Sequence, residues 1–438
     1  MRAGRILAAI LLIGGLIGVL VGAGEIYPKF LYLGLLIIVV SWVWTQLSLR
    51  GVSIKRRARS LRASVGDIFE EHFELSNDSR ISKLWIEISN ESNMPGAYGS
   101  RLLTMVGGRQ KRTHLARTRM IRRGGFRLGP TRLVSGDPFG LFRTERLFPA
   151  GHSLVVYPMI YEISSFIAPP GLLPGGQVIR RKALDITPHA SGVREYVPGD
   201  PLKRIHWPST ARRGQIIVKE FEQDPQAEVW LFLDAQRTIH AEKPFDYPET
   251  YGDNWMFGRR AEYELPPSTF EYAISISASL AHYYLRQPRA VGLVTASHQF
   301  RVIPAERSER QENKILETLS FMEAESDLSI AGLVAAQAGQ LPQGSSAILV
   351  TPTVQPELIA IVDDLQRRNL RPVVILLIAD SFGGLKGGEK IYSTLLARNV
   401  PICRIYNGAD LSLELSSFSS TINLKETSWQ RPPLSHLT

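Results

Sequence analysis

The sequence is nearly free of cysteine. Its 438 residues include a single one, Cys403, in the apolar run VPICRIY. One thiol can form neither an internal disulfide nor a thiolate metal site, so a reducing compartment suits this chain. Because its neighbours are apolar, we expect Cys403 to be a buried core residue.

The sequence also lacks the short motifs of common catalytic sites. It contains no Gly-x-Ser-x-Gly, no His-Glu-x-x-His and no P-loop, which argues against the corresponding hydrolases, zinc proteases and nucleotide hydrolases. We therefore predict no catalytic residue and no enzymatic activity. One alternative stays open, a hydrolase in which His206 acts as general base beside Asp200. A histidine on a short turn next to Trp207 is more often packed and hydrogen-bonded.

Long apolar runs, by contrast, open the chain. Ile6–Gly24 and Phe30–Leu47 are each near the length that crosses a bilayer as a helix. Trp42 and Trp44 lie near the end of the second run, where aromatic rings favour the headgroup zone. The sequence predicts a transmembrane two-helix hairpin in residues 1–50. A cleaved signal peptide suits the first run less well, because a second apolar run follows almost at once.

Basic residues flank both apolar runs. Arg2 and Arg5 precede the first run. After the second run comes a cluster of cations: Arg50, Lys55, Arg56, Arg57, Arg59 and Arg62. The positive-inside rule then predicts a multi-pass protein of the plasma (inner) membrane, with both termini and the soluble domains in the cytoplasm. Much of the formal charge of +10 lies near the membrane, so we predict membrane lipid as a partner and no nucleic acid.

Residues 51–158 have the pattern of short β-strands. Segments such as IFEEHFEL and KLWIEIS alternate, or nearly alternate, between apolar and polar residues, which predicts a small β-sandwich. Within this region, residues 122–143 (RRGGFRLGPTRLVSGDPFGLFR) are rich in turn-forming glycine and proline. We interpret them as a structural corner in which Phe139, Leu141 and Phe142 form an apolar plug.

The rest of the chain divides into a linker with a turn-rich segment (159–222), an α/β domain (223–415) and a C-terminal tail (416–438). In the α/β domain, fully apolar strands alternate with helical stretches, which argues for a parallel sheet covered on both faces. The predicted helices are Phe270–Leu285, Glu309–Glu323, Pro356–Arg368 and Lys390–Arg398. A long insertion, 240–267, follows the strand that ends at Asp234, and we expect it to shape or block the binding crevice.

Residues 191–222, SGVREYVPGDPLKRIHWPSTARRGQIIVKEFE, are the most informative segment. A Pro-Gly pair suits the centre of a type II turn, and Ser209-Thr210 suits a short helical turn that ends at Gly214. Two interpretations of the arginines remain open: an internal ion-pair network, or a docking surface for a partner's acidic residues. The arginines concerned are Arg194, Arg204, Arg212 and Arg213.

This pattern resembles the signature of the bacterial family called domain of unknown function 58. The resemblance rests on Arg194-x-Tyr196-x-Pro198-Gly199-Asp200, Arg204-x-His206-Trp207, and Ala211-Arg212 followed by VKEFE. A second match runs from RGGF at 123–126 to DPFGLF at 137–142. The family usually has Asp or Asn at the position of His206. The apolar N-terminus and the α/β half also fit, so the resemblance covers nearly the whole chain.

The resemblance implies a von Willebrand factor type A-like (Rossmann-like) α/β domain and a non-enzymatic role. It implies a membrane-anchored adaptor or scaffold for a MoxR-type AAA+ ATPase, in the assembly or maturation of envelope or other complexes. No catalytic residue carries over from the family. The predicted partner-binding or structural signature comprises Arg194, Tyr196, Gly199, Asp200, Arg204, His206, Trp207 and Arg212.

The same resemblance raises the question of a metal. A von Willebrand type A metal site uses Asp-x-Ser-x-Ser after the first strand, with Thr and Asp from later loops, because Mg²⁺ prefers such oxygens. Here Asp234 and Thr238 are the candidate ligands, while Gln236 stands at the first Ser and Arg237 adds a positive charge. We therefore predict no cofactor and keep a Mg²⁺-dependent adhesion module with a degenerate site as the alternative.

Overall fold

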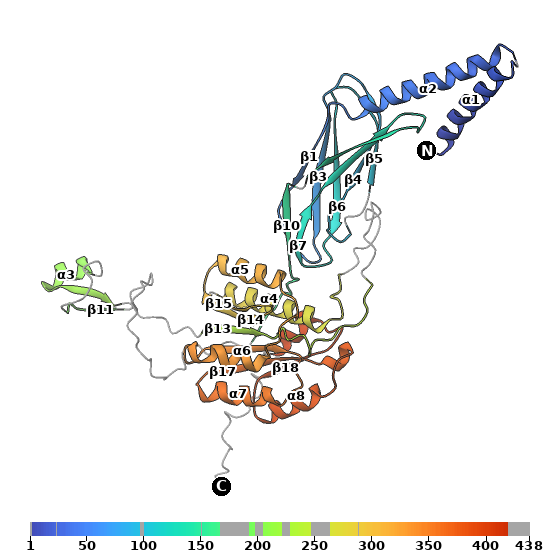
Figure 1. The fold of residues 1–438 in the computed structure, drawn as a ribbon. Helices are drawn as coiled ribbons and strands as arrows, with labels where there is room; N and C mark the ends of the chain where they lie inside the picture. The colour runs from blue at the N-terminus through green and yellow to red at the C-terminus, as the bar shows by residue number, and fades with distance from the viewer. Residues whose placement is uncertain are drawn as a thin grey trace, which may run out of the picture. The chain divides into compact units, whose positions relative to one another are not determined.

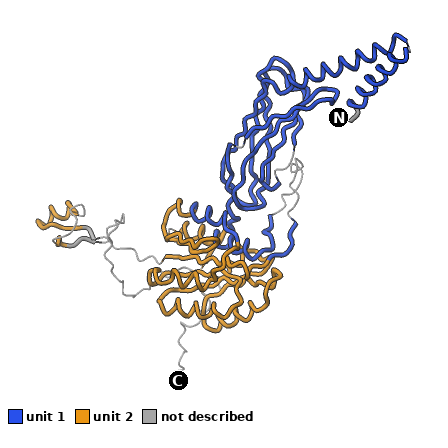
Figure 2. Tube along the Cα trace, in the orientation of Figure 1, with its two compact units in different colours: residues 1–161, 242–278, 313–323 blue, residues 162–241, 279–312, 324–438 orange. Residues whose placement is uncertain are grey.

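The computed structural model describes residues 2–22, 24–96, 100–149, 151–166, 192–197, 205–220, 228–246, 263–287 and 289–418. Contacts divide the chain into two compact units, each discontinuous in sequence (Figure 2). Unit 1 comprises residues 1–161, 242–278 and 313–323, and unit 2 comprises residues 162–241, 279–312 and 324–438. The predicted domain boundaries, which are continuous in sequence, stay a prediction.

Several predicted features lie wholly or largely outside the described residues. They are the linker around 167–191, the turn at 198–204 that includes Gly199, Asp200 and Arg204, most of the insertion 240–267, and the tail from 419.

The predicted pair of apolar helices opens unit 1: α1 (Arg2–Leu20) and α2 (Ile26–Ser48). Glycines let the two helices approach closely, because a Cβ on Gly15 would lie 2.8 Å from the backbone nitrogen of Leu31. Among the described residues, α2 is the helix that is long and apolar enough to cross a bilayer, judged by length and composition. The helix pair is confirmed, while its passage through a membrane as a hairpin stays a prediction.

The β region of unit 1 follows directly. Its strands are β1 (Val52–Ala58), β2 (Arg62–Ser64), β3 (Ile68–Asn77), β4 (Lys83–Asn90), β5 (Ser100–Val106), β6 (Lys111–Arg119), β7 (Gly124–Leu128), β8 (Thr131–Gly136), β9 (Arg143–Phe148) and β10 (His152–Tyr157). They form three sheets, in the orders β1-β3-β6, β5-β4-β8-β9 and β2-β10-β7. The strands expected from the IFEEHFEL and KLWIEIS segments are thereby confirmed as β3 and β4.

The first two of these sheets share one apolar core, as in a β-sandwich. Leu75 of β3, Ile86 of β4 and Leu133 of β8 are fully buried in it. Leu49, which follows α2, belongs to the same core, so α2 continues into the β region without a flexible linker. At that junction the buried Lys83 donates its Nζ proton to the carbonyl of Leu47 at 2.6 Å, a favourable place for a cation at a helix C-terminus. Burial lowers the pKa of Lys83.

Unit 2 contains a six-stranded sheet in the order β15-β14-β13-β16-β17-β18. Its strands are β13 (Val229–Leu233), β14 (Val291–Ala296), β15 (Phe300–Glu306), β16 (Ser346–Thr351), β17 (Arg371–Leu377) and β18 (Ile402–Ile405). All neighbours are parallel except β15, which pairs antiparallel with β14 at the edge. Every residue of β13, β14 and β16 is buried, which confirms the predicted α/β region with apolar strands.

Helices cover this sheet (Figure 1). They are α4 (Thr269–Arg286), α5 (Glu309–Ser320), α6 (Ile330–Gln337), α7 (Glu357–Arg367) and α8 (Gly388–Ala397), with short 3₁₀ turns η3 (Ala338–Gln340) and η4 (Ala379–Phe382). Trp230 and Phe232 of β13 pack in one core with Leu333 of α6 and Leu395 of α8. Cys403, on β18, is buried as expected. The first part of α4 and the last part of α5 belong to unit 1.

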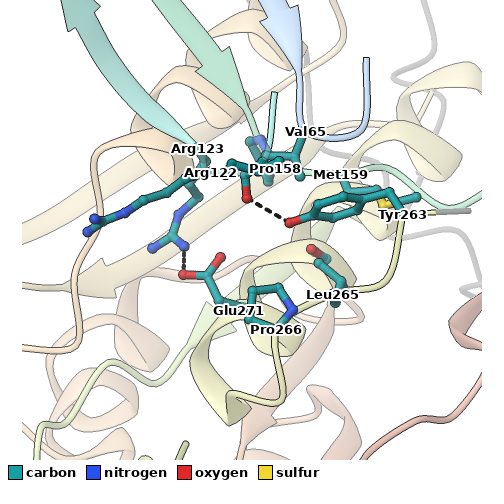
Figure 3. Close-up of a pocket in the computed structure, with 11 residues that line it drawn as sticks. Val65, Arg122, Arg123, Pro158, Met159, Tyr263, Leu265, Pro266 and Glu271 are labelled. Carbon is teal, nitrogen blue, oxygen red and sulfur yellow. Dashed lines mark hydrogen bonds and ion pairs between the residues drawn. The ribbon is translucent and has the colours of Figure 1, made fainter. Parts of the chain in front are cut away.

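A buried arginine holds the discontinuous segments of unit 1 together. Arg123, just before β7, forms an ion pair with Glu271 of α4. Its Nε donates to the carbonyl of Leu319 at 3.1 Å, and its Nη2 donates to that of Met322 at 2.5 Å. Figure 3 shows this ion pair beside a pocket that Tyr263 also lines. Residues far apart in sequence therefore meet at one guanidinium, which supplies the donors that their carboxylate and carbonyl oxygens need.

The two glycines after Arg123 are required by the same packing. Gly124 has a φ of 133°, a backbone conformation that favours glycine. A Cβ on Gly125 would lie 2.7 Å from the ring of Phe321. The RGGF motif is therefore a corner, as predicted, and its arginine anchors that corner to the ends of α4 and α5.

Replacing Arg123 by methionine should destabilise unit 1 markedly. The change leaves Glu271 and two carbonyl groups without their donor, so we expect the free energy of unfolding to fall by about 2–4 kcal/mol. Chemical denaturation of the detergent-solubilised chain measures this loss. Arg122→Met is the matched control, because Arg122 is exposed and should change stability by less than about 0.5 kcal/mol. Equal effects of the two substitutions would contradict the anchoring role.

Candidate functional site

The family-like signature folds as a small module in unit 2. Strands β11 (Gly192–Glu195) and β12 (Ile217–Glu220) pair antiparallel, and helix α3 (Trp207–Arg213) lies between them in sequence. Proline stands in the first turn of α3, where its missing N–H has no cost, and Gly214 ends the helix in a left-handed conformation with a φ of 67°. The predicted helical turn that ends at Gly214 is confirmed.

Hydrogen bonds inside the module engage His206. Its backbone N–H donates to the carbonyl of Ile217 at 2.8 Å, and its Nδ1 lies 2.7 Å from the hydroxyl of Ser209. His206 occupies the N-cap position of α3. Asp and Asn are preferred at N-caps, which gives a physical reason for the residue types expected at this position. The ring of His206 thus has a structural partner within its own turn.

The module exposes large apolar and basic side chains. Trp207 is 68% exposed, Val197 57% and Ile216 47%. The bond from the N–H of Tyr196 to the carbonyl of Ile216 and the bond from His206 to Ile217 bring these residues into neighbouring backbone positions. Arg212 and Arg213, in the last turn of α3, are also exposed. We name the set Trp207, Val197, Ile216, Arg212 and Arg213 the signature surface.

The structure thus brings together five of the predicted signature residues, Arg194 of β11 among them. Tyr196, His206, Trp207 and Arg212 lie in this module. The backbone of Arg194 pairs with Val218 of β12.

A second candidate site lies at the switch point of the sheet. Strand β13 is central, and the chain proceeds from it to neighbours on opposite sides, so a crevice is expected at the carboxyl ends of β13 and β16. Asp234 directly follows β13, and Thr351 ends β16. The hydroxyl of Thr351 donates to Oδ2 of Asp234 at 2.7 Å, and the N–H of Gln236 donates to Oδ1 at 3.2 Å.

Burial dominates the electrostatics of this site. Asp234 is fully buried, and burial raises the pKa of its carboxyl group to about 6, against the opposing effect of the hydrogen bonds from Thr351 and Gln236. The Nε2 of His240 lies 3.0 Å from the backbone carbonyl of Asp234, and burial lowers the pKa of His240 to about 4. Burial therefore disfavours the charged form of both side chains, which lie close together at the end of β13.

Thr351 is the threonine that contacts Asp234, and Thr238 stays a predicted metal ligand. Thr238 is exposed. The register that pairs Leu233 with Val350 already places Asp234 opposite Thr351, but sequence reasoning followed the Asp-x-Ser-x-Ser spacing and missed this neighbour. Among the described residues, no group of three or more His, Cys, Asp and Glu is arranged to hold a metal ion.

The signature module and Asp234 of the second site fall within the part of the chain that a family model recognises, whereas Thr351 lies outside it. The model described as "Protein of unknown function DUF58" matches residues 192–241. The chain carries the DUF58 signature. The resemblance to this family is confirmed for residues 192–241, a segment that runs from β11 through α3, β12 and β13 to Ala241.

Individual proteins resemble this chain only weakly. The uncharacterized protein YeaD of Bacillus subtilis (strain 168) is 23% identical over 203 residues, which cover 45% of this chain and 43% of YeaD. The chain thus matches less than half the length of this relative. A CARDB domain from Pyrococcus furiosus covers 24% of this chain and 91% of its own at 10% identity with a TM-score of 0.19. A β-glucosidase from Listeria innocua covers 24% and 16% at 9% identity with a TM-score of 0.15. TM-scores this low carry no argument.

Replacing Asp234 by asparagine should change how stability depends on pH. The folded carboxyl group has a pKa of about 6 against an ordinary 3.8, so the stability it contributes is fully present below pH 3.8 and is lost as pH rises through 6. Asparagine does not titrate. The stability of the wild type relative to Asp234→Asn should therefore fall by on the order of 3 kcal/mol from pH 3.5 to 7.

Denaturant titrations at several pH values measure this difference. Asp327→Asn, at a side chain that is 94% exposed, controls for the loss of one negative charge. A wild-type-to-variant difference that stays constant from pH 3.5 to 7 would contradict the buried environment of Asp234.

Proposed function

We propose that this chain is a membrane-anchored, non-enzymatic interaction protein. In this proposal α1 and α2 cross the plasma membrane as a hairpin, with both termini and the soluble parts in the cytoplasm. The α/β region is a von Willebrand type A-like platform, which its central strand β13 and the strand-end Asp234 support. The chain serves as an adaptor for a MoxR-type AAA+ ATPase in the assembly or maturation of envelope or other complexes.

The observation that carries this proposal is the exposure of Trp207. An indole that is 68% exposed contributes little to the fold, whereas Trp and Arg are the residue types that most often dominate protein–protein interfaces. Ile216 and Val197 are also exposed apolar residues, in neighbouring backbone positions. The signature surface therefore has the composition of a docking site: an aromatic anchor, aliphatic neighbours and cations.

The cations specify the chemistry of the partner. Arg212 and Arg213 are exposed at the end of α3, so their guanidinium groups can reach carboxylates of another protein in two-point contacts. Of the two interpretations left open by the sequence, this exposure favours docking over an internal ion-pair network for these two residues. We propose that the partner surface is acidic around an apolar pocket for the indole of Trp207.

The Mg²⁺-dependent adhesion module is less well supported. Mg²⁺ demands several oxygen ligands in near-octahedral geometry, and at this site Asp234 supplies the carboxylate while both of its oxygens already accept hydrogen bonds. The hydroxyl of Thr351 donates to Asp234 and accepts from the N–H of Thr353. The described residues therefore do not fit the cation, and we propose that Asp234 braces the end of β13 to β16. The hydrolase alternative is weakened by the contact between His206 and Ser209.

Substitution of Trp207 tests the docking surface. Tagged full-length chain, purified from membranes with its bound proteins, should recover an AAA+ ATPase identified by mass spectrometry. Trp207→Ala should reduce that recovery about tenfold or more, as expected for an interface anchor. Leu413→Ala is the matched control, because Leu413 is 63% exposed and lies outside the signature surface. Failure of the wild type to recover any AAA+ ATPase would dismiss this partner, and undiminished recovery by Trp207→Ala would place docking elsewhere.

Titration with Mg²⁺ or Mn²⁺ tests the metal alternative. Calorimetry of the full-length chain in detergent should show no saturable binding, because the one buried carboxylate at the site is already engaged. Saturable binding that Asp234→Ala abolishes and Asp327→Ala retains would instead support the adhesion module.

A further inference from the structure

The loop between β8 and β9 has a rigid conformation that points one aromatic ring outward. The carboxylate of the buried Asp137 accepts the N–H of Phe139 at 2.9 Å and that of Phe142 at 2.7 Å. Leu141 is buried, as the predicted apolar plug requires, but Phe139 is 46% exposed. The plug interpretation is therefore wrong for Phe139, whose ring has no place in the core although its backbone is fixed.

This loop lies directly against α1. The Nε of Arg5 donates to the carbonyl of Leu141 at 3.3 Å. Gly4 packs so closely on the carbonyl of Phe139 that no Cβ would fit between them. All of these residues belong to unit 1. The loop of residues 137–142 is thus in contact with the N-terminal turns of an apolar helix.

The packing of α1 on α2 shows the depth at which this contact occurs. Gly15 lies against Leu31, and Gly34 lies against Leu12. Continuing this antiparallel register puts Arg5 level with Ser41 and Trp42. Trp42 is 54% exposed near the C-terminal end of α2. Phe139 is therefore placed at the level of a tryptophan that marks the edge of the apolar span, where aromatic side chains favour the headgroup zone.

The junction between α2 and β1 keeps the loop at the level of Trp42. The last turn of α2 is fixed to β4 by the bond from Lys83 to the carbonyl of Leu47. Leu49 and Val52, just after the helix, are core residues of the β region. The end of α2 is thus attached to the β region by a hydrogen bond and by core residues, and the loop contacts the first turns of α1.

We infer that the loop 137–142 lies in the headgroup zone of the bilayer and that the ring of Phe139 inserts among the lipids beside Trp42. We infer that lipid covers this exposed ring, because the backbone of Phe139 lies against Gly4, which is followed on α1 by the exposed apolar residues Ile6 and Leu7. The contact seats the β region on the membrane surface in addition to the anchoring by α1 and α2. This inference rests on the membrane anchoring proposed above.

Site-directed spin labelling of the full-length chain tests the inference. Three single-cysteine substitutions carry the label: Phe139→Cys in the loop, Val39→Cys in the middle of α2 and Ile68→Cys as the aqueous control. Ile68 is 43% exposed, close to the value for Phe139, and it lies at the opposite end of β3 from Asn77, which pairs with Val52 next to α2. Native Cys403 is buried, and burial raises the pKa of its thiol to about 12, so it reacts slowly with the label.

The labelled chains are reconstituted in vesicles of phosphatidylcholine and phosphatidylglycerol, and collisions with oxygen and with a water-soluble nickel chelate are measured by power saturation. Oxygen is enriched in lipid and the chelate in water. We expect the label at 39 to collide mainly with oxygen and the label at 68 mainly with the chelate. The label at 139 should show an oxygen-to-nickel ratio severalfold above that at 68.

The other outcomes distinguish failure of the loop inference from failure of the proposed membrane anchoring. If position 139 matches position 68 while position 39 reports lipid, the loop inference is overturned and the anchoring stands. If position 39 also matches position 68, the anchoring itself is wrong. Protection of position 139 from both reagents would show that protein, another copy or a partner, covers the loop instead of lipid. Unchanged thermal unfolding of each labelled chain confirms that the substitutions leave the fold intact.

Discussion

A single buried guanidinium holds unit 1 together. Arg123 is 148 residues from Glu271 and 199 residues from Met322 in sequence, yet it bonds to both. A desolvated arginine must find partners for its donors, and here the carboxylate on α4 and the carbonyls at the end of α5 supply them. The close packing of Gly125 on Phe321 follows from the same corner. Unit 1 therefore includes the first part of α4 and the last part of α5 in addition to the β region.

The sequence predicted those elements whose pattern is local. The helices α4, α5, α7 and α8 are found close to the predicted helical stretches, and the α/β region contains the apolar strands that its sequence pattern indicated. The edge strand β15 was missed because it is largely exposed and contains Pro304. It therefore lacks a continuous apolar run, and proline argues against a strand in the interior of a sheet. The bonds that join the discontinuous segments of unit 1, such as Arg123 to Glu271, leave no periodic trace in the sequence.

The same distinction applies to the candidate sites. Asp234 was recognisable as a polar residue at a strand end, but its true neighbour Thr351 depends on which strand lies beside β13 and in which register. The end of α3 at Gly214 could be predicted from turn chemistry. The exposure of Trp207 could not, because a tryptophan between His206 and Pro208 in a short turn has the same sequence pattern whether its ring is in a core or on a surface.

At both ends of the β region, buried polar side chains form hydrogen bonds with backbone groups. At the end next to α2, the buried Lys83 bonds a helix carbonyl and the buried Asp137 fixes a loop. At the corner before β7, Arg123 bonds carbonyls at the end of α5. Each polar group is buried and partnered, so loosening either end would leave an unpaired donor or acceptor in the interior. Buried, partnered polar groups therefore hold both ends of the β region closed.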